Sequence, residues 1–318
     1  MIDVITIGET MVRLSTINYR TLEQSGMLDF SVAGSESSVA ISLSRLGIKT
    51  AWISKLVDDP LGRKIVQNIQ SHGVDTSKVV WTQKGRIGIY FIEYGVTPRS
   101  TKIVYDRKNS AINSLKPEEI DWNCFNDVKL VHLSGITAAL SKNCAELVKK
   151  TIFEARKKRK KTVSFDLNYR SRLWGVRKAR IFFEKVLPNI DILIAAKRDI
   201  EMVFGMKISV ESMFQKIKEM FGNKIIVITA GSNGAFAHDG KIYHCKAYKT
   251  FEVDRIGAGD AFTAGFIYGY LIKKDTISAL SYGNAMAALK YTMPGDIPYI
   301  TRNDIENLIL KGSCSIER

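Results

Sequence analysis

The chain has 318 residues, 45% of them hydrophobic and 25% charged, which is enough to bury one large core and excludes a disordered, fibrous or small disulfide-stabilised protein. Its formal charge is +15, from 47 lysines and arginines against 32 aspartates and glutamates, and this charge alone does not choose among nucleic acid, an acidic surface and an anionic small molecule as the partner. The longest apolar runs have the length of strands, which argues against a membrane-spanning helix, and no secretory signal is visible, so we expect a cytoplasmic protein.

Short apolar runs alternate with segments of helical periodicity along most of the chain. In chain order the pattern predicts a strand at 3–7, a helix at 37–46, a strand at 50–54, a helix at 61–72, a strand at 130–133, a helix at 144–159, strands at 162–166, 190–194 and 224–229, and a helix at 260–273. Strands that alternate with helices indicate βαβ units. We therefore expect an α/β fold with a mostly parallel central sheet flanked by helices on both faces.

Two stretches interrupt this alternation, at about 12–33 and 88–110. The second contains an alternating strand at 88–94, a turn with proline and a strand at 101–105, which is the pattern of a β-hairpin. Because open α/β sheets bind ligands beyond the carboxyl ends of their strands, we expect a small β-sheet inserted there as a lid over an active site. An edge hairpin without function is the alternative. No linker or repeat is visible, so residues 1–318 are expected to form one domain.

A run of small residues, Gly257, Ala258 and Gly259, precedes Asp260 at the start of a predicted helix. Small residues let the backbone N–H groups of such a turn converge, and the helix dipole adds positive potential, so the turn is expected to bind phosphate. Asp260 stands beside it, where phosphoryl transfer needs a carboxylate to accept the proton of the attacking hydroxyl. The simpler alternative is that Asp260 only caps the helix.

Two motifs together resemble the signatures of the ribokinase-like (PfkB) carbohydrate kinases, and the resemblance covers essentially the whole chain. The early motif is Ala33-Gly34-Ser35-Glu36-Ser37-Ser38 at the start of the first long helix, and the late motif is the segment at 254–260, about 220 residues further on. The resemblance implies a ribokinase-like fold, ATP as phosphoryl donor, and Mg²⁺ held mainly by phosphate and water, with no protein metal ligand expected. The four cysteines and four histidines show no zinc or disulfide spacing, and no P-loop motif is present.

Within that family the chain looks like the bacterial-type 2-keto-3-deoxygluconate kinases. The likeness rests on Tyr-Asp-Arg-Lys-Asn-Ser-Ala at 105–111, Asp-Leu-Asn-Tyr-Arg-Ser-Arg-Leu-Trp at 166–174 and Met-Pro-Gly-Asp at 293–296. It implies a sugar-acid kinase that phosphorylates the terminal hydroxyl of 2-keto-3-deoxygluconate. The alternatives are a fructokinase, a ribokinase, a 5-keto-2-deoxygluconate kinase, or a kinase-fold binding protein without catalysis.

The resemblance also assigns the site residues, and the carboxylate of the sugar acid gives a physical reason for arginines among them. Catalysis is expected from Asp260 with the turn residues Gly257, Ala258 and Gly259. Substrate contacts are expected from Gly34, Ser38, Tyr90, Tyr105, Arg107, Arg170 and Asp260. Nucleotide contacts are expected from Asn168, Arg170, Thr229, Gly231, Ser232, Gly234, Gly257, Gly259 and Asn284.

Two positions depart from the family pattern, because Ser38 and Ala196 stand where the family has asparagine. Two polar anchors are thus reduced, and we interpret the chain as a divergent but active kinase. The exposed edges of a small lid sheet are usually paired or covered, so we expect a homo-oligomer, at least a dimer through the lids. A sugar acid and ATP are the other expected partners; a membrane and nucleic acid are not expected.

Overall fold

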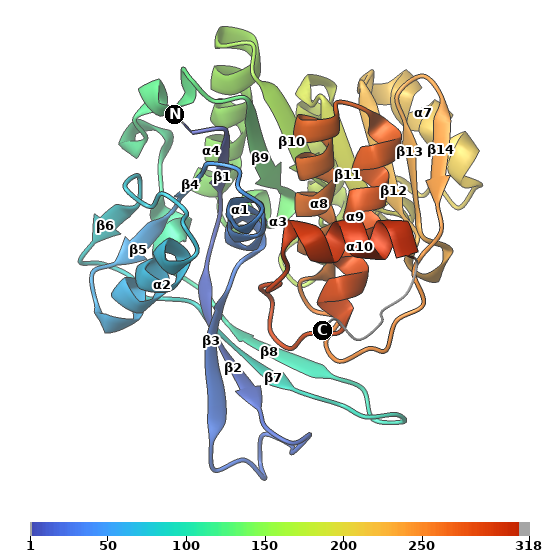
Figure 1. Ribbon diagram of the computed structural model, residues 1–318. Helices are drawn as coiled ribbons and strands as arrows, with labels where there is room; N and C mark the ends of the chain where they lie inside the picture. The colour runs from blue at the N-terminus through green and yellow to red at the C-terminus, as the bar shows by residue number, and fades with distance from the viewer. Residues whose placement is uncertain (1, 312–318) are drawn as a thin grey trace.

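The computed structural model describes residues 2–311, so Cys314 and the rest of the C-terminus lie outside the described residues. A sheet of eight strands runs through the middle of the molecule in the order β14-β13-β12-β11-β10-β9-β1-β4 (Figure 1). Its strands are β1 (Val4–Ile7), β4 (Thr50–Ile53), β9 (Leu130–Ser134), β10 (Thr162–Asp166), β11 (Ile192–Ala196), β12 (Ile225–Thr229), β13 (Ala235–His238) and β14 (Ile242–Cys245). Neighbouring strands from β4 to β12 are parallel, whereas β13 and β14 add an antiparallel edge. The mostly parallel sheet is therefore confirmed.

Helices cover both faces of this sheet, as predicted. One face carries α1 (Ser35–Arg45), α8 (Ala258–Lys273) and α9 (Thr276–Tyr291), with α10 (Arg302–Lys311) against α9 (Figure 1). The other face carries α4 (Lys142–Ile152), α5 (Val176–Val186), α6 (Lys197–Phe204) and α7 (Val210–Phe221). Beside β4 lie α2 (Pro60–Ser71), β5 (Lys55–Val57) and β6 (Val80–Thr82), while α3 (Gly135–Leu140) follows β9. Short 3-10 helices are Ala111–Ser114, Pro117–Glu119, Trp122–Phe125, Leu187–Asn189 and Gly231–Asn233.

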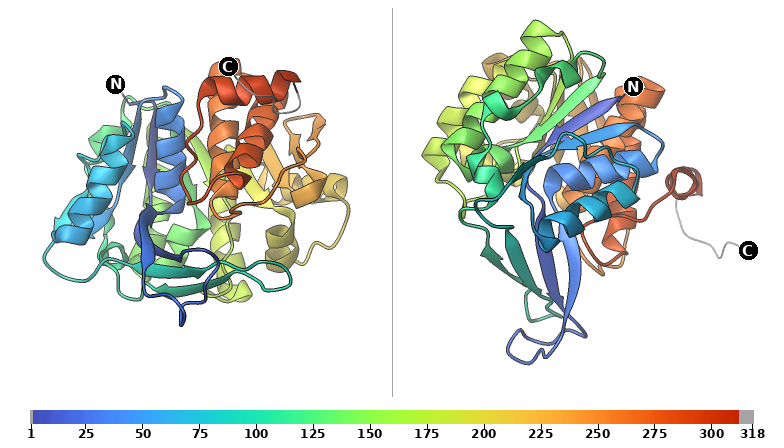
Figure 2. Two further views of the ribbon diagram at one scale, coloured as in Figure 1. Left: turned by 60° about the horizontal axis from the view of Figure 1, so that its bottom comes forward. Right: turned by 90° about the vertical axis from the view of Figure 1, so that its left-hand side faces the viewer.

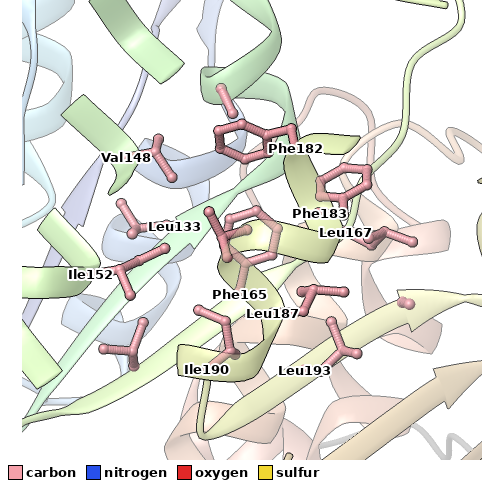
Figure 3. Close-up of a cluster of buried hydrophobic side chains, with 14 of the residues drawn as sticks. Leu133, Val148, Ile152, Phe165, Leu167, Phe182, Phe183, Leu187, Ile190 and Leu193 are labelled. Carbon is pink, nitrogen blue, oxygen red and sulfur yellow. The ribbon is translucent and has the colours of Figure 1, made fainter. Parts of the chain in front are cut away.

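The two faces of the sheet are separated by the period-2 alternation of the strands. Along β1, for example, Val4 contributes to the core under α1 and α8, whereas Ile5 contributes to the core under α4 and α5. In the second core the rings of Phe165 and Phe183 meet edge to face, with centroids 6.1 Å apart (Figure 3). Because both faces are covered, the parallel strands are apolar on both sides, which is why the sequence shows them as continuous apolar runs.

One predicted helix is interrupted. The helix expected at 144–159 begins at Lys142, after the cap Ser141, and leaves α-helical geometry at Ile152 for a π-helical turn, Phe153–Lys158. Glu154 lies buried in that turn and accepts contacts from Lys150, Lys158 and Arg159. The wider turn lets one acidic residue of a basic segment stay inside, which helical periodicity alone does not reveal.

A second sheet of four strands projects from the main sheet, at the bottom of Figure 1 and toward the viewer in the left view of Figure 2. Its order is β3-β2-β7-β8, with β3 (Leu28–Ala33), β2 (Met11–Thr16), β7 (Ile89–Glu93) and β8 (Lys102–Asp106). The strands β2 and β7 are parallel, and the two outer pairs are antiparallel. The smaller sheet expected from 12–33 and 88–110 is thus present, and we call it the small sheet. It starts at the carboxyl end of β1, because only residues 8–10 separate β1 from β2.

Candidate active site

Several polar segments meet where the parallel strands end, next to the small sheet. The residues that follow β10 and β12 lie at the same edge of the main sheet, since the carboxyl ends of parallel strands point the same way. The first turns of α1 and α8 meet at this edge, as the contact between Ser35 and Asp260 shows. Two helix N-termini and several strand ends therefore converge on one place.

A chain of two hydrogen bonds links Asp260 on α8 to α1 and to the loop after β10. Ser35 Oγ, in the first turn of α1, donates to Asp260 Oδ1 at 2.5 Å, and Asn168 Nδ2 donates to Ser35 Oγ at 3.2 Å. Asn168 has a left-handed backbone, with φ 37°, which turns the chain sharply after β10. The structure thus brings the predicted Asp260 and Asn168 together through Ser35, which the sequence analysis quoted in a motif without giving it a role.

Three carboxylates share this edge, and burial raises the pKa of each, while the charge of Arg170 lowers it. Burial raises the pKa of Asp260 to about 6, against the opposing effects of the Ser35 hydrogen bond and the charge of Arg170. Burial, followed by the charges of Asp260 and Asp199, raises the pKa of Asp166 well above its ordinary value. Burial also raises the pKa of Asp199, which accepts a bond from the Tyr169 N–H at 3.1 Å.

Two exposed arginines lie near these carboxylates, and Arg198 Nε is 3.4 Å from Asp199 Oδ1. Arg170 acts on all three carboxylates through its charge, yet among residues 2–311 it forms no ion pair within 4.0 Å. A guanidinium without a fixed partner keeps its donors free for an anionic ligand. The site therefore combines a raised carboxylate pKa with a free cation, the combination expected where a negatively charged group is to be bound and a proton removed.

The turn that opens α8 has the backbone expected of an anion site. Gly257 has φ 82°, and a Cβ there would overlap the carbonyl of Asp296, so only glycine fits. A Cβ on Gly259 would meet nothing within 4 Å, so the space over the first turn is open. The N–H of Ala258 donates to the carbonyl of Arg255 at 3.3 Å, whereas in the described part of the chain the N–H groups of Gly257 and Gly259 have no partner. Two of the three predicted N–H donors are thus free.

The predicted sugar-side residues gather on one face of the small sheet. Ser31, Arg13, Tyr90 and Tyr105 form a row across its four strands. The Tyr90 and Tyr105 rings stack with centroids 5.6 Å apart, and the Tyr90 hydroxyl donates to Asp296 Oδ1 at 3.0 Å. Arg107 lies over the Tyr105 ring and pairs with Glu9. Its Nε is buried without a partner among residues 2–311, so one donor of this arginine stays free.

Two further predicted sugar contacts, Gly34 and Ser38, are not on this face of the small sheet. A Cβ on Gly34 would overlap the carbonyl of Glu9, so close packing against the β1–β2 connection already requires glycine at this position. Ser38 is only 1% exposed, and its hydroxyl has no partner in the described part of the chain. In this structure Ser38 therefore lies inside the protein and does not reach the surface of the site.

The predicted nucleotide-side residues lie on the turn from β12 to β13. Thr229 ends β12, Ser232 is exposed, and Gly231 and Gly234 have positive φ values of 59° and 82°. The Asn284 amide, on α9, donates to the carbonyls of Cys245 and Lys246 at 2.8 and 3.2 Å. Asn284 thus secures the end of β14 next to this turn, and its donor groups are used within the protein.

A set of buried and partly buried polar groups, not predicted from the sequence, lies between the small sheet and the α8 turn. We call Arg13, Tyr94, Asp254, Lys290 and Asp296 the buried ion cluster. Arg13 donates to Asp254 Oδ2 at 2.7 Å and also bonds Asp296 and the Tyr94 hydroxyl. Its members are far apart in the sequence, so no local spacing could have revealed them.

A buried acid at the start of α1 was also missed. Glu36 Oε1 accepts bonds from Ser134 Oγ at 2.7 Å and Thr137 Oγ1 at 2.6 Å, and burial raises its pKa to about 7. A Cβ on Gly8 would overlap the Glu36 carboxyl, which explains this glycine. Glu36 ties α1 to α3 directly behind Ser35, so it supports the hydrogen-bond chain to Asp260.

The described residues 2–311 show neither a metal-binding cluster nor a membrane-spanning helix. No group of three or more His, Cys, Asp and Glu side chains in this range is arranged to hold a metal ion. No helix in the same range has the length and apolarity needed to cross a membrane.

Comparison with known proteins gives consistent findings. The sequence profile described as pfkB family carbohydrate kinase matches residues 1–302. A 2-dehydro-3-deoxygalactonokinase of Haloferax volcanii is 38% identical over 317 residues, with 99% of each chain covered, and a 5-dehydro-2-deoxygluconokinase of Bacillus subtilis is 30% identical, with 96% of this chain and 95% of the relative covered.

Solved structures show the same similarity. The crystal structure of a 2-dehydro-3-deoxygluconokinase from Thermotoga maritima superposes with a TM-score of 0.92 at 31% identity, covering 97% of this chain and 98% of the other. An E. coli protein described as a ribokinase II, solved in complex with ATP and Mg²⁺, superposes with a TM-score of 0.88 at 25% identity, covering 98% and 100% of the two chains. Both similarities extend over the main sheet and the small sheet alike.

Proposed function

The chain belongs to the pfkB family of carbohydrate kinases, and within that family we propose that it transfers the γ-phosphoryl group of ATP to the terminal hydroxyl of 2-keto-3-deoxygluconate, also called 2-dehydro-3-deoxygluconate. The observation that carries the proposal is the position of Asp260. It stands in the first turn of α8 with a raised pKa, next to backbone N–H groups and to the Arg170 guanidinium, none of which has a partner within the described residues 2–311. These are the parts that phosphoryl transfer requires of a protein.

In this mechanism Asp260 acts as the general base. The terminal hydroxyl oxygen of the sugar acid forms a bond to the γ-phosphorus, the bond from that phosphorus to the β–γ bridging oxygen breaks, and the hydroxyl proton passes to the Asp260 carboxylate. ADP leaves with the bridging oxygen. The N–H groups of Gly257 and Gly259 stabilise charge on the transferred group, since they are fixed before the reaction begins. Ser35 and Asn168 keep the carboxylate in place.

The residues on the nucleotide side fit ATP with Mg²⁺. Burial raises the pKa of Asp166, and the charges of Asp260 and Asp199 raise it further, so a divalent cation near Asp166 would relieve this repulsion. When bound, Mg²⁺ neutralises the charge of the polyphosphate and keeps most of its ligands as water and phosphate oxygens. The turn at Thr229, Gly231, Ser232 and Gly234 is open at Gly231, where a Cβ would meet nothing within 4 Å, and Asn284 supports this turn through β14.

The substrate carboxylate is assigned to the arginines of the sugar side. Arg107 is oriented by Glu9, and among residues 2–311 its buried Nε has no hydrogen-bond partner and Arg170 has no ion pair. The substrate carboxylate would accept hydrogen bonds from the guanidinium groups of Arg107 and Arg170. In this role the small sheet acts as a lid whose inner row presents Tyr90 and Tyr105 to the sugar.

A second candidate substrate is the C4 epimer, 2-keto-3-deoxygalactonate, since the Haloferax volcanii relative at 38% identity is named for it. The test is a coupled ADP-release assay with ATP and Mg²⁺ on both epimers, 5-keto-2-deoxygluconate, fructose and ribose. We expect the 2-keto-3-deoxy acids to be preferred over the other three compounds. Preference for a neutral sugar, or no turnover on any of the five, would contradict the proposal.

We also propose that two copies pair through their small sheets. Phe30, Leu14, Phe91 and Val104 form an apolar row across all four strands on the face opposite Arg13 and Tyr90. Phe30 is 42% and Val104 is 51% exposed in the single chain, and a second copy would cover them. Light scattering should give a dimer mass, and Val104→Glu should give a monomer. A monomeric wild type would exclude this pairing.

A further inference from the structure

The buried ion cluster joins three segments that are far apart in the chain. Arg13 comes from β2 of the small sheet, Asp254 lies three residues before Gly257, and Lys290 comes from the last turn of α9. Arg13 is 1% and Lys290 is 0% exposed. Burying two cations is costly unless their charges and donors are satisfied, so the cluster must have a consistent set of partners.

Lys290 holds the backbone of the segment that leads into the α8 turn. Its Nζ donates to the carbonyl of Asp254 at 3.0 Å and to the carbonyl of Met293 at 2.9 Å. These two carbonyls belong to different loops, and the ammonium is the group that links them. Burial lowers the pKa of Lys290, while the charges of Asp254 and Asp296 raise it.

Arg13 holds the side chain of the same residue. Asp254 Oδ2 accepts bonds from Arg13 at 2.7 Å, from the Tyr94 hydroxyl at 2.8 Å and from the Gly295 N–H at 3.1 Å. Asp254 Oδ1 accepts a bond from the Ile256 N–H at 2.9 Å. The backbone of Asp254 is thus held by Lys290 of α9, and its carboxylate is held by Arg13 of the small sheet and by Tyr94, which follows β7.

The segment so fixed leads directly to the proposed phosphate site. Gly257 touches the backbone of Asp296, whose carboxylate also pairs with Arg13 and accepts the Tyr90 hydroxyl. Tyr90 stacks on Tyr105 in the sugar-facing row of the small sheet. A continuous set of contacts therefore runs from the sugar side through Arg13 and Asp254 to the N–H groups of the α8 turn.

We propose that Lys290 and Arg13 are positioning residues for phosphoryl transfer, a buried cation clamp that fixes residue 254 and thereby the orientation of the N–H groups of Gly257 and Gly259. This inference rests on the proposed function of the α8 turn. Neither residue touches the reacting atoms; their contribution is the geometry of the groups that do. A misplacement of such groups by about 1 Å lowers a rate by roughly 100-fold.

The test compares Lys290→Met with Lys178→Met, a matched change at an exposed lysine of α5 on the opposite face of the main sheet. Steady-state kinetics of the full chain should show kcat of Lys290→Met lowered by roughly 100-fold. The KM for ATP should stay within about threefold of wild type, because the nucleotide turn after β12 is untouched. Lys178→Met should behave as wild type.

Chemical rescue separates positioning from a merely structural role. In Lys290→Ala the missing atoms correspond to propylammonium, whose cation can bind the carbonyls of Asp254 and Met293. We expect added propylammonium to raise the kcat of Lys290→Ala at least about tenfold and to leave wild type and Lys178→Met unchanged. This readout also holds if Lys290→Met fails to fold.

Several outcomes would overturn the clamp: a folded Lys290→Met with wild-type kcat, a loss confined to melting temperature, or a Lys290→Ala variant that propylammonium does not rescue. A wild type that phosphorylates no sugar acid would instead overturn the proposed function. Activity in wild type together with full activity in Lys290→Met would overturn the clamp alone.

Discussion

Two groups of arginine and aspartate lie on either side of the α8 turn, and they differ in how their charges are paired. In the buried ion cluster Arg13 bonds Asp254 and Asp296, and the guanidinium is almost inaccessible. At the sheet edge Arg170 is exposed and unpaired within residues 2–311, although three carboxylates feel its charge.

The same types of side chain thus serve two purposes, because one group stabilises the fold and the other is available to bind a ligand. Paired charges in the interior fix backbone segments, and removing one partner leaves the other uncompensated. Unpaired charges at the end of a parallel sheet keep their donors and acceptors available. The following predictions test whether the buried charges stabilise the fold and the exposed charges bind the ligand.

The largest effect is expected at the sheet edge from Asp260→Asn. Loss of a general base lowers kcat by about 10² to 10⁴, and ATP binding measured by calorimetry should persist because the nucleotide turn is unchanged. Asp239→Asn, at the exposed turn between β13 and β14, serves as control. An Asp260→Asn enzyme with wild-type turnover would show that Asp260 is not the general base.

A large loss of stability is expected from the buried cluster with Arg13→Met. The substitution leaves the buried Asp254 and the partly buried Asp296 without their main cation, which costs about 3–5 kcal/mol in the free energy of unfolding. Urea unfolding followed by circular dichroism measures it. A change below about 1 kcal/mol, which is the contribution of an exposed ion pair, would show that Arg13 does not stabilise the fold as a buried ion pair does.

Arg170→Ala should show the opposite behaviour. The side chain is exposed and unpaired, so stability should stay within about 0.5 kcal/mol of wild type. Loss of charge-assisted hydrogen bonds to substrate should lower kcat/KM for the sugar acid by about 10- to 100-fold. Arg177→Ala, an exposed arginine at the start of α5, is the control. An equal change in kcat/KM for Arg170→Ala and Arg177→Ala would contradict the assignment of Arg170 to the substrate.

The smallest effect is a shift in the pH profile. Because the pKa of Asp260 is raised to about 6 and the base must be ionised, kcat/KM should fall as the pH drops through about 6. The Ser35 hydrogen bond lowers that pKa, so Ser35→Ala should move the acid limb to higher pH. A limb that stays in place or moves to lower pH would show that Asp260 is not the group observed.

Local patterns sufficed for the parallel core. The strand predicted at 162–166 matches β10, and the helix predicted at 260–273 begins only two residues earlier, at Ala258. These elements carry their own signals, because a buried strand is continuously apolar and a glycine-rich turn opens a helix. The antiparallel edge of β13 and β14 and the π-helical turn at 153–158 carry no such signal, so they were not foreseen.

The α/β architecture, the small sheet, the family and the helix-opening turn before Asp260 could be predicted from the chain alone, because each is signalled by short motifs or runs of neighbouring residues. The link from Asn168 through Ser35 to Asp260, the burial of Ser38, and the meeting of Arg13 and Lys290 at Asp254 became visible only in the folded protein. Such pairings join residues up to 283 positions apart. Their partners are chosen by how the sheets and helices pack, which no local pattern of residues encodes.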